Sequence, residues 1–243
     1  MAPWEVGIEE LKTSLDPFFN INALREFIQK AKEYLPAMGK RYLDVGHGKR
    51  FEFPVGLARE LSDASVMNYD SRKWTTKAFS LWQRGQRRKR VYLPENLSVS
   101  KFSKPRPFFD GVFYIFTLHE FLRKEDDEGP RETLKEVKKL LRPGRNIYIV
   151  DYDLEGASEK IVRAVFNAKN EIGIVTPGSG SFEKDWYGAH TGYSKARCID
   201  DLEGLGYEIV YEESQPKGIG FRRGELEWSE KMSKLFFVIA RAA

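Results

Sequence analysis

One stretch decides the fold, Tyr42-Leu43-Asp44-Val45-Gly46-His47-Gly48-Lys49-Arg50, and a second apolar run that ends in an acid follows it, Val66-Met67-Asn68-Tyr69-Asp70. A strand, a Gly-x-Gly turn, a helix and a second strand with a terminal acid form a nucleoside pocket at the carboxyl edge of an α/β sheet. Glycine allows a tight turn and close approach of the backbone to a ligand, and a carboxylate at Asp70 can accept both ribose hydroxyl protons. We therefore expect a nucleoside-type cofactor.

The alternation of strand and helix patterns continues beyond this unit. Strands are expected at 41–45, 65–69, 90–93, 109–116 and 146–150. Helices are expected at 54–61, 74–82 and 131–141, the last of them stopped by Pro143-Gly144. This alternation predicts a doubly wound, mostly parallel sheet.

The two ends of the chain add a helical arm and a closing hairpin. Apolar residues recur at helical spacing over 24–35, and Pro36 with Gly39 ends that helix before the first strand. Further helices are expected at 158–170 and 194–205, followed by strands at 207–212 and 235–240. No strong helix pattern separates these last two strands, so the sheet is expected to have seven strands and to close with an antiparallel one.

A single domain over residues 1–243 accommodates these elements. It consists of the arm at 1–40, a cofactor-binding half at 41–151, and the lid and closing strands at 152–243. The lid is the aromatic, glycine-rich segment from Trp186 to Tyr193, which we expect to cover the sheet edge. Trp186, Tyr187 and Tyr193 would stack there on a flat substrate.

The composition indicates a globular protein without a membrane partner. The chain has 243 residues, 41% of them hydrophobic, 31% charged, and a formal net charge of +4. It contains no long uncharged apolar run and its first residues lack a signal-peptide pattern, so we expect a cytoplasmic location. Cys198 is the only cysteine, which excludes an intramolecular disulfide, and we expect it to be a small buried hydrophobe. No His/Cys/Asp spacing resembles a metal site.

The chain resembles the class I S-adenosylmethionine-dependent methyltransferases, whose sheet ends in an antiparallel strand. The resemblance rests on Leu43-Asp44-Val45-Gly46-His47-Gly48, Tyr69-Asp70-Ser71, Phe109-Asp110-Gly111-Val112-Phe113, Leu118-His119-Glu120, Val137-Lys138-Lys139-Leu140-Leu141-Arg142-Pro143-Gly144 and Gly204-Leu205-Gly206-Tyr207-Glu208-Ile209-Val210. These pieces follow the family's order and, as a set, are far more specific than any one of them.

The resemblance implies S-adenosylmethionine as the cofactor and a set of residues that hold it. The implied set is Asp44, Gly46, His47, Gly48, Asp70, Phe116 and Thr117, with the backbone of the glycine turn under the methionine part and Asp70 on the ribose. Two positions depart from the family pattern. Arg50 stands in place of a third glycine and would clamp the cofactor carboxylate or narrow the site, and Arg145 stands where a second glycine commonly follows Pro-Gly.

Methyl transfer requires an aligned acceptor and, for a protonated acceptor, a base. His119 and Glu120, at the mouth of the central strand, are the best pair for this work, because a neutral imidazole accepts a proton near pH 7. The structural alternative is that His119 caps the strand end or packs on the next helix. His190 in the lid is the second candidate.

The sequence therefore predicts methyl transfer, preferably to a small molecule. A tRNA or rRNA acceptor is the second interpretation, because the basic run Arg84-Gly85-Gln86-Arg87-Arg88-Lys89-Arg90 could bind RNA phosphates, although such runs are more often solvated helix ends. A binding module that has lost its cofactor is the other class. A nicotinamide-dependent dehydrogenase is disfavoured by the closing hairpin and the missing third glycine.

Overall fold

The computed structural model describes residues 21–36, 39, 41–46, 65–69, 91–92, 107–122, 128–153, 193–214 and 235–243. Within these ranges no helix is long and apolar enough to cross a bilayer. The predicted helices at 54–61, 74–82 and 158–170, and the lid apart from Tyr193, lie outside the described residues.

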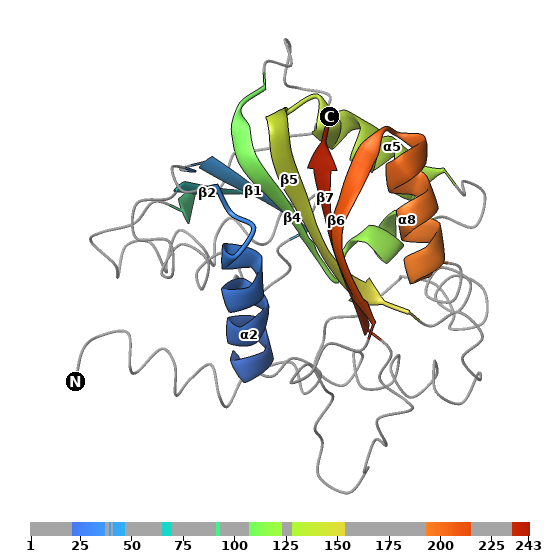
Figure 1. Ribbon diagram of the computed structural model, residues 1–243, viewed down its shortest axis with the longest axis horizontal. Helices are drawn as coiled ribbons and strands as arrows, with labels where there is room; N and C mark the ends of the chain where they lie inside the picture. The colour runs from blue at the N-terminus through green and yellow to red at the C-terminus, as the bar shows by residue number, and fades with distance from the viewer. Residues whose placement is uncertain are drawn as a thin grey trace, which may run out of the picture.

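The described strands form one mixed α/β sheet in the order β3-β2-β1-β4-β5-β7-β6 (Figure 1). The strands are β1 (Arg41–Val45), β2 (Ser65–Tyr69), β3 (Val91–Tyr92), β4 (Phe109–Ile115), β5 (Leu141–Tyr152), β6 (Tyr207–Ser214) and β7 (Leu235–Ala242). The pairings from β3 through β5 are parallel, and β7 runs antiparallel to both of its neighbours. The prediction of a mostly parallel α/β sheet with an antiparallel closing strand is confirmed.

The direction of sheet growth reverses between β1 and β4. From β1 the chain adds β2 and then β3 on one side, and it then returns to place β4 and β5 on the other side. In doubly wound sheets, ligands bind in the crevice outside the carboxyl ends of the strands at such a reversal. The topology therefore directs attention to the ends of β1 and β4, near Val45 and Ile115.

Helices cover both faces of the sheet, as Figure 1 shows. One face carries α5 (Gly129–Lys138) and α8 (Lys195–Gly204), and the other carries α2 (Ile21–Lys32). The side chains of β1 alternate accordingly, since Leu43 and Val45 belong to the apolar cluster beneath α5 and α8. Residues 42–45 of β1, 109–114 of β4 and 146–152 of β5 are buried, which explains why these parts of the strands are mostly apolar in sequence.

The face beneath α2 is aromatic. Phe113 stacks on Tyr148 with ring centroids 4.5 Å apart, and Phe27 of α2 meets Phe237 of β7 edge to face at 4.6 Å. Beyond the end of α2, the carbonyl oxygen of Tyr34 accepts hydrogen bonds from Tyr148 Oη and from the Asn146 side chain. Phe237 pairs with the carboxyl half of β5, whereas Asn146 lies toward its amino end. The helical arm thus runs from the carboxyl edge of the sheet toward the amino edge.

The boundary between α5 and β5 differs from the sequence prediction. The helix ends at Lys138 and the strand begins at Leu141, so Pro143-Gly144 does not stop the helix but lies inside the strand range. Pairing with β4 is interrupted there, because Phe109 pairs with Leu141 while Gly111 pairs with Asn146. The Pro-Gly dipeptide therefore lies in a bulge and does not end the helix. Proline and glycine are common in bulges as well as at helix ends.

Candidate functional site

Gly46 ends β1 in a conformation that only glycine adopts without strain. Its φ angle is +77°, and a Cβ at this position would overlap the side chain of Thr117. The Thr117 hydroxyl lies 3.1 Å from the Gly46 carbonyl oxygen and 2.9 Å from that of Ile115, to which it donates. Thr117, expected next to Phe116 at the methionine amino group, thus lies against the glycine turn. The contact joins the ends of β1 and β4 at the reversal point.

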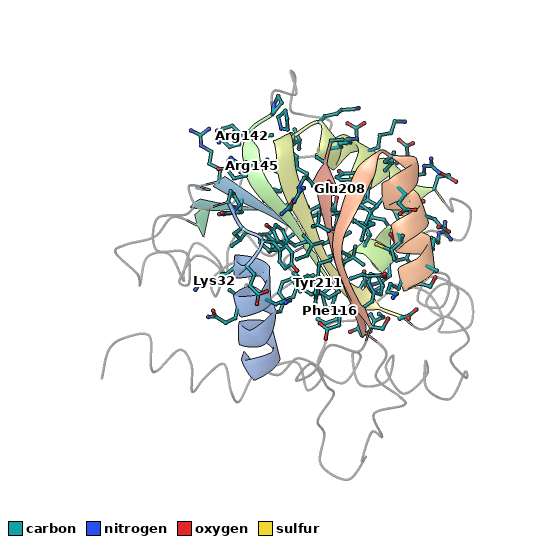
Figure 2. All side chains as sticks on the ribbon, in the orientation of Figure 1. Lys32, Phe116, Arg142, Arg145, Glu208 and Tyr211 are labelled. Atoms are coloured by element: carbon teal, nitrogen blue, oxygen red, sulfur yellow. The ribbon has the colours of Figure 1, made fainter. Side chains whose placement is uncertain are left out.

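Phe116 leaves β4 with a φ angle of +52°, and it is the only residue other than glycine with a positive φ in the part of the chain that the structure describes. Its backbone N–H donates to the Val150 carbonyl oxygen at 2.8 Å, so neighbouring strand β5 holds this conformation in place. A bulky residue in the left-handed region costs about 1–3 kcal/mol and is concentrated at ligand sites. The half-buried Phe116 ring lies at the carboxyl edge of the sheet (Figure 2).

A short 3-10 helix, η2 (Leu118–Phe121), follows Thr117 and is tied to β5 by one carboxylate. Asp151 accepts hydrogen bonds from His119 Nδ1 at 2.5 Å, from the His119 backbone N–H at 3.0 Å and from the Tyr152 backbone N–H at 2.8 Å. Both side chains of the His119–Asp151 pair are fully buried. Because Asp151 faces three donors, the neutral imidazole holds its proton on Nδ1 in this arrangement.

Aromatic contacts connect this buried pair to the edge. The Tyr152 ring lies 5.0 Å from Phe116 and 5.3 Å from His119, both measured between ring centroids. Displacement of η2 would therefore disturb the ring stack that supports Phe116. His119 is packed at the strand end, the position expected if its role is structural. Within the described residues its carboxylate partner is Asp151.

The remaining predicted site residues divide into two groups. Asp44 is buried near the carboxyl end of β1, and Gly46 follows the last residue of that strand, Val45. Outside the described residues lie His47, Gly48, Arg50, Asp70 and His190, together with the side chain of Glu120. Asp44, Gly46, Phe116 and Thr117 are thus the predicted cofactor residues that the structure brings to one edge.

The prediction that Tyr193 stacks on a substrate is wrong. Its ring is fully buried beside α8 and lies 6.0 Å from the Arg197 guanidinium, so it is not available to stack on a substrate. Burial raises the pKa of Tyr193 well above its ordinary value, and neighbouring Cys198 adds to the shift. Burial also raises the pKa of the Cys198 thiol. The expected burial of Cys198 is confirmed, and a protonated thiol is a poor nucleophile.

Sequence reasoning missed the role of Asp151. The strand ending at this acid was predicted, but not its contact with His119. The sequence indicated only that both residues lie near the carboxyl ends of two parallel strands, and the alignment that pairs them comes from the structure.

No protein-family model matches the sequence, and no curated protein matches it. Solved structures do share its fold. A SAM-dependent methyltransferase from Methanosarcina mazei has 20% identity and a TM-score of 0.58, with 87% of this chain and 96% of that chain covered. For a SAM-dependent methyltransferase from Aquifex aeolicus the identity is 18%, the TM-score 0.55, and the coverage 93% and 100%.

A third structure, the CurJ carbon methyltransferase, has 16% identity and a TM-score of 0.57. The alignment covers 89% of this chain, which spans 52% of the CurJ chain. At identities this low, the structural matches show a shared fold. The chain has the fold of the class I SAM-dependent methyltransferases, as the sequence predicted.

Proposed function

We propose that this protein transfers a methyl group from S-adenosylmethionine to a small-molecule acceptor. The observation that carries the proposal is the meeting of the Gly46 turn with Thr117 at the reversal between β1 and β4. A ligand-binding crevice is expected at that point of a doubly wound sheet. The methyltransferases that share the fold give the reaction class.

The described residues at this edge suit a cationic cofactor. A sulfonium and an ammonium group favour carboxylates and aromatic faces, and the edge carries Asp44, Asp151 and the Phe116 ring. Asp44 would orient the turn or meet the ammonium group, and the backbone after Gly46 would lie beneath the methionine part. His47, Gly48, Arg50 and Asp70 complete the proposed set from their positions in the sequence.

The bound cofactor would supply an already activated methyl group, so the chain has to align the acceptor and accept its proton. His119 and Glu120 are our candidates for proton transfer. Asp151 would fix the imidazole so that Nδ1 carries the proton and Nε2 has the lone pair. Because the imidazole is buried, its direct action as a base requires the acceptor to reach below the Phe116–Tyr152 ring contact.

A small-molecule acceptor is supported by two further structures with this fold. These are the mitomycin 7-O-methyltransferase MmcR and the N,N-8-amino-8-demethyl-D-riboflavin dimethyltransferase RosA, each 14% identical to this chain. We place the acceptor side at the N-terminal arm and at the remaining lid residues 186–192, because neither belongs to the core pattern of alternating strands and helices. An RNA acceptor is the alternative at this same edge.

A second candidate function is a role without methyl transfer. The [4+2]-cyclase SpnF has this fold with a TM-score of 0.57, so the fold also supports other chemistry. The complete burial of His119 favours this candidate, because a buried imidazole has no direct access to an acceptor.

Calorimetry with S-adenosylhomocysteine tests the proposal. We expect the parent protein to bind it, and Asp70→Asn to lower the affinity about tenfold or more, because a ribose hydroxyl would lose a charged acceptor. Glu208→Gln is the matched control, since it removes an exposed carboxylate from β6 (Figure 2). Absence of binding by the parent would refute the cofactor assignment, and binding of NAD in its place would support the dehydrogenase interpretation. Binding without methyl transfer to any offered acceptor would favour the second candidate.

A further inference from the structure

The amino ends of the parallel strands form a second edge, opposite the proposed cofactor site. Figure 2 shows Arg142 and Arg145 at the end of the sheet remote from Phe116. Both arginines lie at the start of β5, next to the first residues of β4. The two edges are therefore separated by the length of the central strands, and a ligand at one does not occupy the other.

A bulge in β5 brings these two arginines together. Phe109 pairs with Leu141 and Gly111 pairs with Asn146, so residues 142–145 all lie opposite Asp110. Gly144 turns the bulge with a φ angle of +71°, and a Cβ there would meet nothing within 4 Å. The turn is thus open on its outer side, and its two flanking arginines can reach one carboxylate.

Asp110 is that carboxylate, and it organises the arginines from below. Arg142 Nη1 lies 2.6 Å from Asp110 Oδ1, and Arg145 Nε lies 3.9 Å from the same oxygen. The Asp110 side chain is 2% exposed, whereas those of Arg142 and Arg145 are 40% and 37% exposed. One buried negative charge is therefore set against two cations that still face solvent. A planar guanidinium held in this way retains donors for a phosphate group.

An exposed aromatic ring adjoins the two arginines. Phe108 is 37% exposed, more than any other large hydrophobic side chain within the described ranges. Arg41 connects it to the carboxylate, because the Arg41 backbone N–H donates to Asp110 Oδ2 at 3.1 Å and its guanidinium lies 4.5 Å from the Phe108 ring centroid. Cations beside an exposed flat ring are the two components of a surface that binds single-stranded nucleic acid.

We propose that this group, which we call the amino-edge clamp, binds single-stranded RNA. It consists of Arg41, Phe108, Asp110, Arg142 and Arg145. Arg142 and Arg145 hold backbone phosphate, and Phe108 stacks on a base. The charge balance supports a polyanion, because the clamp holds three guanidinium groups and one carboxylate: those of Arg142 and Arg145 lie at Asp110, and that of Arg41 lies over Phe108. The exposed ring favours RNA over an isolated phosphate ion, which has no face to stack. Because the clamp lies opposite Phe116, the bound RNA is a partner and not the assigned methyl acceptor.

Fluorescence anisotropy with a labelled oligouridine tests the clamp. We expect Arg145→Gln to weaken binding about tenfold, as expected for loss of a charge-assisted contact. The slope of log affinity against log salt should fall by about 0.7 for one lost phosphate contact. Lys135→Gln is the matched control, because it removes one positive charge from the exposed surface of α5. This control should leave both quantities unchanged.

Phe108→Ala separates RNA from other anions. It should weaken oligouridine binding by about fivefold or more, since stacking on an aromatic ring contributes substantially for each base. The proposal is overturned if Arg145→Gln and Lys135→Gln behave alike, or if Phe108→Ala has no effect on RNA. It is also overturned if the protein binds vesicles of anionic lipid but not the oligonucleotide. A thermal melt of each variant shows whether the fold is retained.

Discussion

Two buried carboxylates lie at opposite ends of neighbouring central strands, and their surroundings differ. Asp151, at the carboxyl end of β5, accepts three N–H groups and faces the buried imidazole of His119. Asp110, at the amino end of β4, faces Arg142 and Arg145, whose guanidinium groups still contact solvent. Burial of a carboxylate requires donors in both places, but only Asp110 receives them from exposed cations.

The difference shows how one sheet separates two kinds of site. Donors from buried backbone fix Asp151 in a single arrangement, which suits a site that has to hold η2 and Phe116 in place. Donors from long exposed side chains let Asp110 organise a surface without closing it. A buried aspartate therefore stabilises the interior at one edge, and at the other edge it holds arginines that present positive charge to solvent.

The sharpest test of this comparison replaces each carboxylate by its amide. Asp151→Asn should lower the free energy of unfolding by about 3–5 kcal/mol, because its amide N–H₂ opposes a buried donor and the buried pair is broken. Asp110→Asn should lower it by only about 1 kcal/mol, since water can solvate the arginines. Urea unfolding monitored by tryptophan fluorescence measures both. Equal losses would remove the distinction between the two carboxylates.

The glycines of the two edges provide the next comparison. Gly46 and Gly144 have similar φ angles, +77° and +71°, but only a Cβ at Gly46 would meet another side chain, that of Thr117. Gly46→Ala should therefore cost about 2–4 kcal/mol from strain and overlap together, and Gly144→Ala about 1–2 kcal/mol from strain alone.

The difference between the two alanine variants isolates the overlap with Thr117. It should shrink when Thr117 is changed to Ser, because the Cγ2 methyl group is one of the overlapping atoms. Chemical denaturation of the parent and of four variants measures this: Gly46→Ala and Gly144→Ala, each alone and each combined with Thr117→Ser. Persistence of the full difference in the Thr117→Ser background would show that the methyl group does not determine the packing.

The smallest expected effect concerns another buried carboxylate, Asp201 of α8. Burial raises its pKa above the ordinary value of 3.8, against the opposing influence of Arg197 and Arg131. A raised carboxyl pKa means that stability is greatest with the proton bound and is lost as pH rises from about 4 through the folded-state pKa. Asp201→Asn should therefore raise the melting temperature at pH 7 relative to the parent by about 2–4 °C, and by less at pH 4.

Glu203→Gln is the control for Asp201, because it removes an exposed carboxylate from the same helix and Glu203 is not among the charges that shift the pKa of Asp201. Its difference from the parent should not change between pH 4 and pH 7. Calorimetric melts at the two pH values suffice. A lower melting temperature for Asp201→Asn at pH 7 would show that the arginines outweigh the burial of Asp201.

Much of the described sheet could be predicted because hydrophobic burial dominates its strands. The ranges expected at 41–45 and 65–69 are those of β1 and β2, and the arm helix and closing antiparallel strand also agree with the prediction. The predicted start of β5 was wrong, because a Pro-Gly pair such as Pro143-Gly144 occurs both at helix ends and in strand bulges. Local residue preference cannot distinguish these uses, since pairing with β4 decides between them.

The candidate site was predictable to a smaller extent. The tight turn at Gly46 was predictable, because it needs a glycine and the sequence shows one, but the contact of Gly46 with Thr117 was not predicted. The pairing of His119 with Asp151 depends on the relative alignment of two strands, which one sequence does not reveal. The burial of Tyr193 was missed for a related reason, because an aromatic residue beside glycines looks the same whether it covers a ligand or fills a core.

The docking of α2 on the last strands has a consequence for synthesis at the ribosome. Phe27 of α2 packs on Phe237, and Tyr34 beyond the helix packs on Tyr211, so these two contacts form only when β6 and β7 have been made. At about 5–20 residues per second, the helix waits for tens of seconds with its Phe27 side uncovered. The early chain is then exposed to aggregation, and folding of this face is delayed until β7 has been synthesised. Chaperone dependence of the nascent protein would be a direct result of where one helix sits.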